Sequence, residues 1–223
     1  MSRTISVKGK ARVTAPADIT GVEATVKGHR DDFEAAINAM TEMTVSLKDA
    51  IEAAGIPRGD LRTSDVSVRQ AYRKVKIGTD RYGADRFKDV ADGFDFTQNI
   101  VFEFSNDNSK LSKAISGILA CGIEPRIDLY FRSSDREGMK NRALADACRN
   151  AKTEAETILQ SVGARLGSLL SVDRNVHRYY DDDDLRMNLD MCIGAKCNSM
   201  EMEVDPEDVS VDEDVTMVWE IEG

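Results

Sequence analysis

Residues 141–163 read NRALADACRNAKTEAETILQSVG and carry the repeat that decides the fold. Alanine recurs at every fourth position, at 143, 147, 151 and 155. In a helix these positions share one face, and their small side chains allow that face to lie close to a sheet. Ser133-Ser134-Asp135 is a suitable start for such a helix, and Gly163 is a suitable end. We therefore predict a long helix from Asp135 to about Val162.

Alternating polar and apolar residues at both ends of the chain indicate strands. Residues 4–14 and 22–26 alternate with a period of two, which is typical of half-buried strands. The short connection Pro16-Ala17-Asp18 between them favours two adjacent antiparallel strands. Gly9 lies where a bulge or a close approach to another segment would fit. Residues 209–221 alternate again and are predicted to form a final strand or hairpin.

Two more helices and four more strands are predicted between these ends. Apolar residues from Phe33 to Ala54 recur at steps of three and four, behind Asp31 as the N-cap. A shorter helix follows the capping run 106–109 and ends at Gly122. The additional strands are expected at 65–72, 94–104, 127–131 and 169–176. Long helices mixed with alternating strands predict an α+β fold with mainly antiparallel sheets, each covered by helices on one face.

The charge of the chain is unevenly distributed. Its 223 residues include 30 Lys and Arg and 40 Asp and Glu, which gives a net charge of −10. From Cys197 onward there are ten acidic residues and no Lys or Arg, so residues 1–196 are balanced. Between residues 62 and 88, by contrast, eight basic residues accompany three acidic ones. The negative net charge disfavours binding to nucleic acid or to anionic lipid.

No motif in the sequence specifies a catalytic, cofactor or metal site. His29 and His177 lie in no metal-binding frame and have no evident orienting partner. Neither a G-x-S-x-G motif nor a glycine-rich phosphate loop is present. Cys192 and Cys197 are expected to be free thiols, with a reversible disulfide as the alternative. The four aspartates 181–184 are expected in a solvated loop, with weak divalent binding as the alternative. We therefore predict a protein that is not an enzyme and that holds no cofactor or metal.

The basic segment is the most promising candidate for a functional surface. Three interpretations are open: a solvated hairpin or mobile loop, a nucleic-acid site, and a contact with the acidic C-terminal segment. The nucleic-acid site would use Tyr72, Tyr82 and Phe87, and the net charge of the chain disfavours it. The charge-complementary contact could form within one chain or between neighbouring copies. Its predicted residues are Arg69, Arg73, Lys74, Lys76 and Arg81 on the basic side, and Glu207, Asp208, Asp212 and Asp214 on the acidic side.

Three stretches of the sequence, in this order, resemble the SIMPL (DUF541) family. Residues 5–11, ISVKGKA, followed by Pro16-Ala17-Asp18, resemble the family's opening I-x-V-x-G-x-A and P-D, with Ala17 inserted. Residues 141–167 resemble its alanine-rich helix and the G-x-x-L-G that follows. Residues 205–211, DPEDVSV, and 215–221, VTMVWEI, resemble its C-terminal strands. The likeness extends over essentially the whole chain.

The resemblance implies two α/β-sandwich subdomains. One would be built from both chain termini, residues 1–92 and 195–223, and the other would be an inserted subdomain of residues 93–194. Bacterial members of the family include periplasmic immunogenic and stress-associated proteins that form ring- or channel-like homo-oligomers. We therefore expect a non-enzymatic protein that assembles with itself and has a scaffold or stress-protection role.

The mammalian member of the family, a signalling protein that binds a pelle-like kinase, implies an alternative. The chain would then be a monomeric or dimeric intracellular adaptor that holds a protein partner through residues 73–92. No apolar run reaches the roughly 18–20 residues that span a bilayer, and the N-terminus lacks the apolar stretch of a signal peptide. We therefore expect a cytoplasmic protein, or a periplasmic one if a signal was removed before residue 1.

Overall fold

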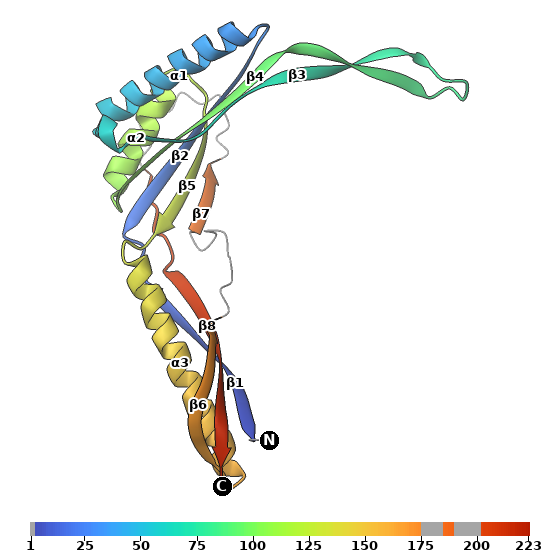
Figure 1. The fold of residues 1–223 in the computed structure, drawn as a ribbon. Helices are drawn as coiled ribbons and strands as arrows, with labels where there is room; N and C mark the ends of the chain where they lie inside the picture. The colour runs from blue at the N-terminus through green and yellow to red at the C-terminus, as the bar shows by residue number, and fades with distance from the viewer. Residues whose placement is uncertain (1–2, 175–184, 190–201) are drawn as a thin grey trace. The chain divides into compact units, whose positions relative to one another are not determined.

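The computed structural model describes residues 3–174, 185–189 and 202–223, which form an α+β fold. The chain divides into two compact units, and each unit is a sheet with helices on one face (Figure 1). Unit 1 consists of Met1–Ile19, Phe131–Leu185 and Pro206–Gly223. Unit 2 consists of Thr20–Tyr130 and Arg186–Asp205. The predicted α+β class is confirmed.

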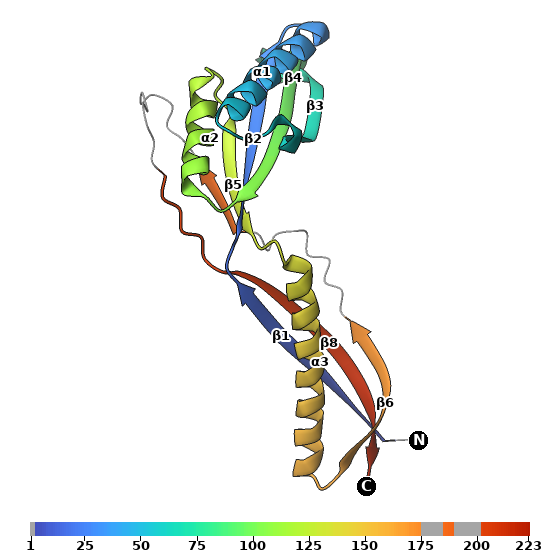
Figure 2. The ribbon, with the colours of Figure 1, turned by 90° about the vertical axis from the view of Figure 1, so that its left-hand side faces the viewer.

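Unit 1 is a three-stranded antiparallel sheet in the order β1-β8-β6, covered on one face by α3 (Figure 2). Its elements are β1 (Thr4–Ala15), α3 (Arg136–Ser161), β6 (Arg165–Arg174) and β8 (Val209–Glu222). β1 and β8 pair along their length, from Thr4 opposite Glu220 to Ala15 opposite Val209. The two ends of the chain therefore build one sheet, as predicted.

The alanine stripe of α3 packs directly against β1. Its four alanines are fully buried, and Ala147, Ala151 and Ala155 share a core with Val7 and Trp219. A Cβ atom added to Gly9 would lie 2.0 Å from the carbonyl oxygen of Ala147 and 2.7 Å from the Cβ atom of Ala151. A separation this short requires glycine on the strand and alanine on the helix, since interiors are close-packed. The predicted close approach at Gly9 is confirmed.

Unit 2 is a five-stranded sheet in the order β3-β4-β2-β5-β7, with α1 and α2 on one face (Figure 1). Its elements are β2 (Ile19–Arg30), α1 (Phe33–Ala53), a 3-10 turn (Arg58–Asp60), β3 (Arg62–Thr79), β4 (Asp85–Ser105), α2 (Asn108–Ala120), β5 (Arg126–Arg132) and β7 (Leu185–Leu189). Its core holds the fully buried side chains of Phe96, Ile100 and Phe102 from β4, Leu47 from α1 and Leu111 from α2. β4 therefore contributes several of the largest side chains of this core.

The ends of two helices follow the expected capping chemistry. The carboxylate of Asp32, and not of the predicted Asp31, caps α1 by accepting a hydrogen bond from the N–H of Ala35 at 2.8 Å. Asp107 caps α2 by accepting from the N–H groups of Ser109 and Lys110. The predicted helices are thus present, with shifts of one or two residues at their starts.

β1 and β2 are not adjacent, so this part of the predicted topology is wrong. β1 pairs with β8 in unit 1, whereas β2 lies between β4 and β5 in unit 2. Alternation identifies a strand but not its neighbour, and the short connection between them does not close a hairpin. The observed units also differ from the predicted division into 1–92 with 195–223 and 93–194, because β2 and α1 belong with β3, β4 and β5.

The structure shifts one predicted strand and adds another. β6 begins at Arg165 rather than at residue 169, and β7 was not predicted. Residues 73–92 belong almost entirely to β3 and β4, which agrees with the hairpin among the forms considered for the basic segment. The final segment is one continuous strand, β8, which is one of its two predicted forms.

Asp18 holds the connection between β1 and β2 to the start of α3. Its carboxylate accepts hydrogen bonds from the N–H of Ser134 at 2.7 Å and from its hydroxyl at 2.5 Å. These bonds, the hydroxyl's first, lower the pKa of Asp18 below its ordinary 3.8. Because the folded pKa is depressed, the carboxylate stabilises the fold above the unfolded pKa. That stabilisation is lost as pH falls through the lower, folded pKa.

We predict that Gly9→Ala destabilises the protein by about 3 kcal/mol, because the new methyl group collides with the backbone of α3. Urea unfolding followed by circular dichroism measures this change. Gly59→Ala is the matched control, since a Cβ atom at Gly59 meets nothing within 4 Å. Equal free energies of unfolding for the two variants would contradict the close packing of β1 and α3.

We predict that Ser134→Ala lowers the free energy of unfolding by about 1 kcal/mol at pH 7, the typical net value of a hydrogen bond in a folded protein. The difference from the wild type should shrink as the pH is lowered through the folded pKa of Asp18, since the proton then removes the charge that the hydroxyl stabilises. Urea unfolding at pH 7 and at successively lower pH measures it, with Ser6→Ala at an exposed position of β1 as control. A difference that does not change with pH would contradict the assigned role of Asp18.

Candidate functional site

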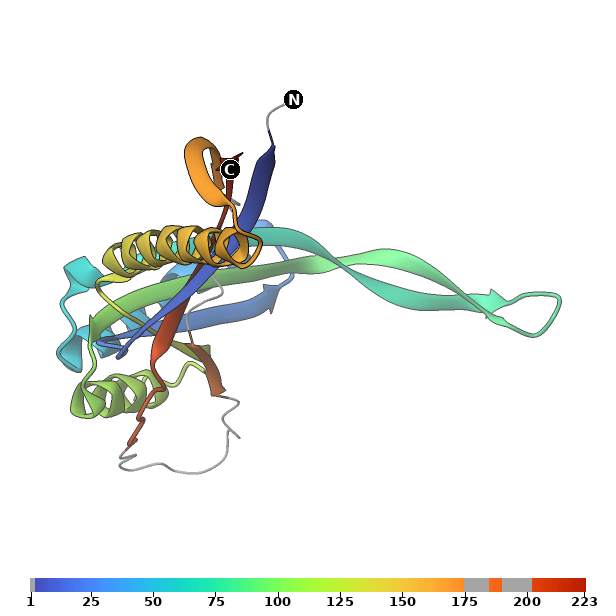
Figure 3. The same cartoon turned by 90° about the horizontal axis from the view of Figure 1, so that it is seen from below.

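The candidate functional surface is the outer part of the β3–β4 hairpin. The two strands pair antiparallel from Arg62 opposite Val101 to Thr79 opposite Asp85. Figures 1 and 3 show this hairpin continuing beyond the sheet of unit 2 as a two-stranded ribbon. We call residues 72–91, outside the register shift that follows Gln70, the arm. Nearly all of its side chains are exposed.

The base of the arm is fixed where β2 ends. A Cβ atom added to Gly93 would lie 2.3 Å from the carbonyl oxygen of Arg30, and Gly93 has a φ of 82°. Only glycine therefore fits at this position, both for its backbone conformation and for its close contact. Beside it, the rings of Phe33 and Phe94 pack edge to face at 5.6 Å. The arm begins from a rigid, closely packed point.

The tip of the arm is a short turn organised by Asp80. Its Oδ1 atom accepts hydrogen bonds from the N–H groups of Tyr82 at 2.8 Å and Ala84 at 2.9 Å. The turn presents Tyr82, which is 80% exposed, with the guanidinium of Arg81 5.0 Å from its ring centre. An aromatic ring and a cation thus form the outermost part of the arm.

Charges of opposite sign face each other across the hairpin. Arg73 and Asp92 form an ion pair at 3.1 Å, and Lys76 and Asp85 form another at 2.6 Å. By register, Lys74 lies opposite Asp89 and Arg69 lies opposite Asp95. The basic residues predicted from 62–88 are therefore largely one strand of a charge-paired hairpin. Most of their acidic partners on β4 follow residue 88. These partners were therefore not counted when residues 62–88 were identified as a basic segment.

Apolar side chains are exposed on both faces of the arm. Tyr72 and Phe87 are 62% and 56% exposed and share one face of the hairpin. Phe87 lies opposite Lys76, and Lys76 is four residues from Tyr72 on the same strand, so all three side chains point to the same side. Val75 and Val90 share the other face and are also exposed. In a monomer these side chains contact water. The sequence analysis noted the aromatic residues and missed the valines, because residues 85–91, DRFKDVA, do not alternate with the period of two that indicates a half-buried strand.

The predicted acidic residues divide into two kinds. Both carboxylate oxygens of Asp212 accept bonds from Arg12, at 2.8 and 2.7 Å, and this lowers the pKa of Asp212. Asp214 forms an ion pair with Lys8 at 2.6 Å. Glu207 and Asp208, which precede β8, are exposed. Two of the four predicted acidic residues therefore form ion pairs within unit 1. The predicted contact between the four acidic residues and the basic residues of 69–81 stays a prediction.

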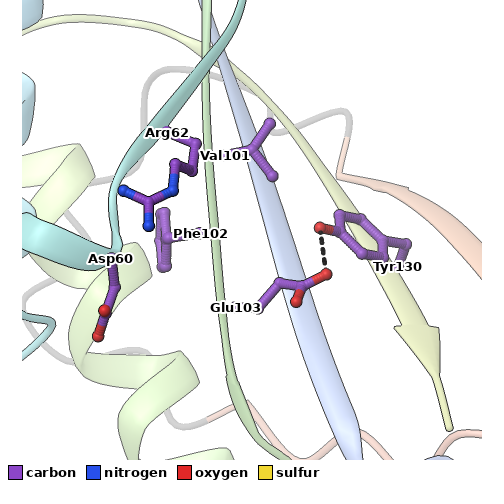
Figure 4. A pocket seen from close by; sticks show the side chains of 6 residues that line it. All are labelled: Asp60, Arg62, Val101, Phe102, Glu103 and Tyr130. Carbon is purple, nitrogen blue, oxygen red and sulfur yellow. Dashed lines mark hydrogen bonds between the residues drawn. The ribbon is translucent and has the colours of Figure 1, made fainter. Parts of the chain in front are cut away.

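A pocket of about 370 Å³ lies on unit 2 where β3 begins (Figure 4). Its lining residues are Asp60, Arg62, Val101, Phe102, Glu103 and Tyr130. The Tyr130 hydroxyl donates to Glu103 at 3.0 Å, and Arg62 donates to the carbonyl oxygen of Gly59 at 2.7 Å. The lining of the pocket thus combines polar side chains that are hydrogen-bonded to each other or to the backbone with the apolar side chains of Val101 and Phe102.

Several other features of the sequence were considered as sites. In the described part of the chain, no group of three or more His, Cys, Asp or Glu side chains is placed to hold a metal ion. None of the helices described there is long and apolar enough to cross a membrane. His29 forms a pair with Asp95 at 2.8 Å at the base of the arm. His177, Asp181–Asp184, Cys192 and Cys197 lie outside the described residues.

We predict that the arm can be shortened without loss of the fold. Replacing residues 74–89 by Asn-Gly joins Arg73 to Val90 through a two-residue turn, which suits an antiparallel pair. The free energy of unfolding should change by less than about 1 kcal/mol, because the removed side chains are exposed. Phe96→Ala in the buried half of β4 should cost about 3–5 kcal/mol and is the comparison. Denaturant unfolding of both variants checks this, and a large loss from shortening would show that the arm supports the core.

Two comparisons with known proteins bear on the identity of the chain. The family model described as "SIMPL: Protein of unknown function (DUF541)" matches residues 5–219, from β1 to β8. A search of curated proteins finds no match. The match includes both units and the whole arm. The chain therefore belongs to the SIMPL (DUF541) family.

Proposed function

We propose that the protein is a non-enzymatic scaffold that assembles with further copies of itself, and that the arm is its contact surface. The observation that carries this proposal is the set of aromatic and aliphatic side chains exposed on the arm. Exposed apolar patches on folded proteins mark interaction surfaces. The resemblance to bacterial family members favours a scaffold or stress-protection role for this assembly.

The physical character of the arm supports an interface. A two-stranded ribbon is marginally stable in water without a third layer, and exposed ion pairs such as Arg73–Asp92 contribute little on their own. A partner that covers Tyr72, Phe87 or the two valines would remove apolar surface from water, at about 25 cal/mol per Å². Binding would therefore stabilise the arm and the assembly together.

A second candidate is an adaptor, monomeric or dimeric, that holds a signalling protein through residues 73–92. The tip favours this alternative, since Arg81 and Tyr82 form a compact aromatic and cationic knob. Residues of these types dominate the binding energy of protein interfaces. The two candidates use the same arm and differ in the partner.

We predict that the wild-type chain has a mass above that of one subunit at micromolar concentration and low salt. Size-exclusion chromatography with light scattering measures this mass. The variant with Asn-Gly in place of residues 74–89 should be a monomer with an unchanged circular dichroism spectrum, because it lacks the contact surface but keeps the core. A wild-type chain that is strictly monomeric would contradict self-assembly, and arm-dependent capture of a different protein would then favour the adaptor.

A further inference from the structure

We infer that the arm of one copy docks on the acidic segment 202–208 of a second copy, in a head-to-tail contact. This inference rests on the proposed self-assembly and specifies which surfaces meet. We call residues 202–208 the acidic strap. The strap contains four acidic residues and no basic one, namely Glu203, Asp205, Glu207 and Asp208.

The arm retains positive charge after the pairing within the hairpin. Residues 72–91 include six basic and three acidic side chains. By register, Arg86 lies opposite Gly78 and Lys88 lies opposite Val75, so neither faces a carboxylate directly across the hairpin. Arg81 lies over the ring of Tyr82 at the tip. This part of the arm is therefore suited to an acidic partner.

The basic residues of β3 disfavour pairing of one arm with an identical arm. β3 is an edge strand of the sheet in the described residues, and an edge strand can accept another extended segment. Arg69, Arg73, Lys74 and Lys76 lie along this edge strand. Basic side chains on an edge strand repel a second strand of the same kind. An acidic extended segment meets no such repulsion.

The strap has the properties that the arm requires. It carries no helix or strand, and α2 holds its first residues: Ser112 Oγ accepts from the N–H of Met202 at 2.9 Å, and Asn108 Oδ1 accepts from the N–H of Val204 at 3.3 Å. Met202 and Val204 are half-buried, whereas Glu203 and Asp205 are exposed. From Met202 to Asp205 the strap thus alternates apolar and acidic residues, and the arm exposes both apolar and basic side chains.

The carboxylates of the strap are also more available than those of β8. Asp212, Glu213 and Asp214 are each held by a basic residue of unit 1: Arg12, Arg174 and Lys8. α2 itself contributes two lysines, Lys110 and Lys113, and the four acidic residues of the strap outnumber them. The strap is therefore the acidic stretch best able to receive the arm.

Geometry within unit 2 assigns the contact to a second copy. Met202 and Val204 are bound to α2. Figures 1 and 3 show the arm leaving the sheet in the direction away from α2. An arm therefore does not reach the part of the strap that its own α2 holds. A contact between two different surfaces is heterologous, and repetition of such a contact builds rings or open chains.

Charge reversal on each side tests this inference. The arm variant is Arg86→Glu with Lys88→Glu, and the strap variant is Glu203→Lys with Asp205→Lys and Glu207→Lys. Each variant alone brings like charges together and should weaken assembly by about 100-fold in dissociation constant. An equimolar mixture of the two should assemble again, because the acidic arm of one meets the basic strap of the other and the unchanged surfaces also match. A chain that carries all five substitutions should assemble as well.

The control is Lys10→Glu with Lys27→Glu, which changes the net charge as much as the arm variant does, at exposed positions outside the arm. Light scattering gives the masses, and circular dichroism checks that each variant is folded. If the wild type assembles and either charge variant assembles equally well, or if the mixture stays monomeric, the contact between arm and strap is wrong while self-assembly stands. If the wild type is a monomer under the same conditions, the proposed function itself is wrong.

Discussion

The buried half of β4 holds the rest of unit 2 in place, including the exposed half of the same strand. Phe96, Ile100 and Phe102 lie in the core between the sheet and the helices, and they fix the strand's position and register. At Gly93 the strand passes the end of β2, where the carbonyl oxygen of Arg30 leaves room only for glycine. Beyond that point the ladder with β3 continues into the arm. The arm is therefore an extension of a core strand, not a loop attached to the surface.

Some charged side chains form ion pairs within the chain, and others remain available for contact with a partner. Many ionic groups are used locally: Arg73 with Asp92, Lys76 with Asp85, and the carboxylates at the start of β8 with Arg12 and Lys8. Exposed pairs such as Arg73–Asp92 contribute little to stability. What remains is a basic arm with exposed apolar side chains and an acidic strap whose first residues are held by α2. The net charge of −10 thus conceals two surfaces of opposite sign.

The sequence predicted local structure well and long-range pairing less well. The alanine repeat and Gly9 predicted a helix packed closely on a strand, because small residues at one face have a direct steric meaning. The same patterns did not show that β1 leaves β2 and pairs with β8, since alternation specifies a face and not a neighbour. For the candidate surface, the basic residues and aromatic rings were visible in the sequence. Their cross-strand partners Asp89 and Asp92 became apparent only when the register of the hairpin was known.

The central claim is that the tip of the arm contacts another copy of the chain. The most direct measurement places a photoactivatable benzoylphenylalanine at Tyr82 in isotopically light protein and mixes it with heavy wild-type protein before irradiation. Mass spectrometry should find cross-links between a light arm and heavy peptides from residues 202–208. Cross-links only within one light chain, or none to heavy protein at concentrations where the assembly forms, would contradict the claim.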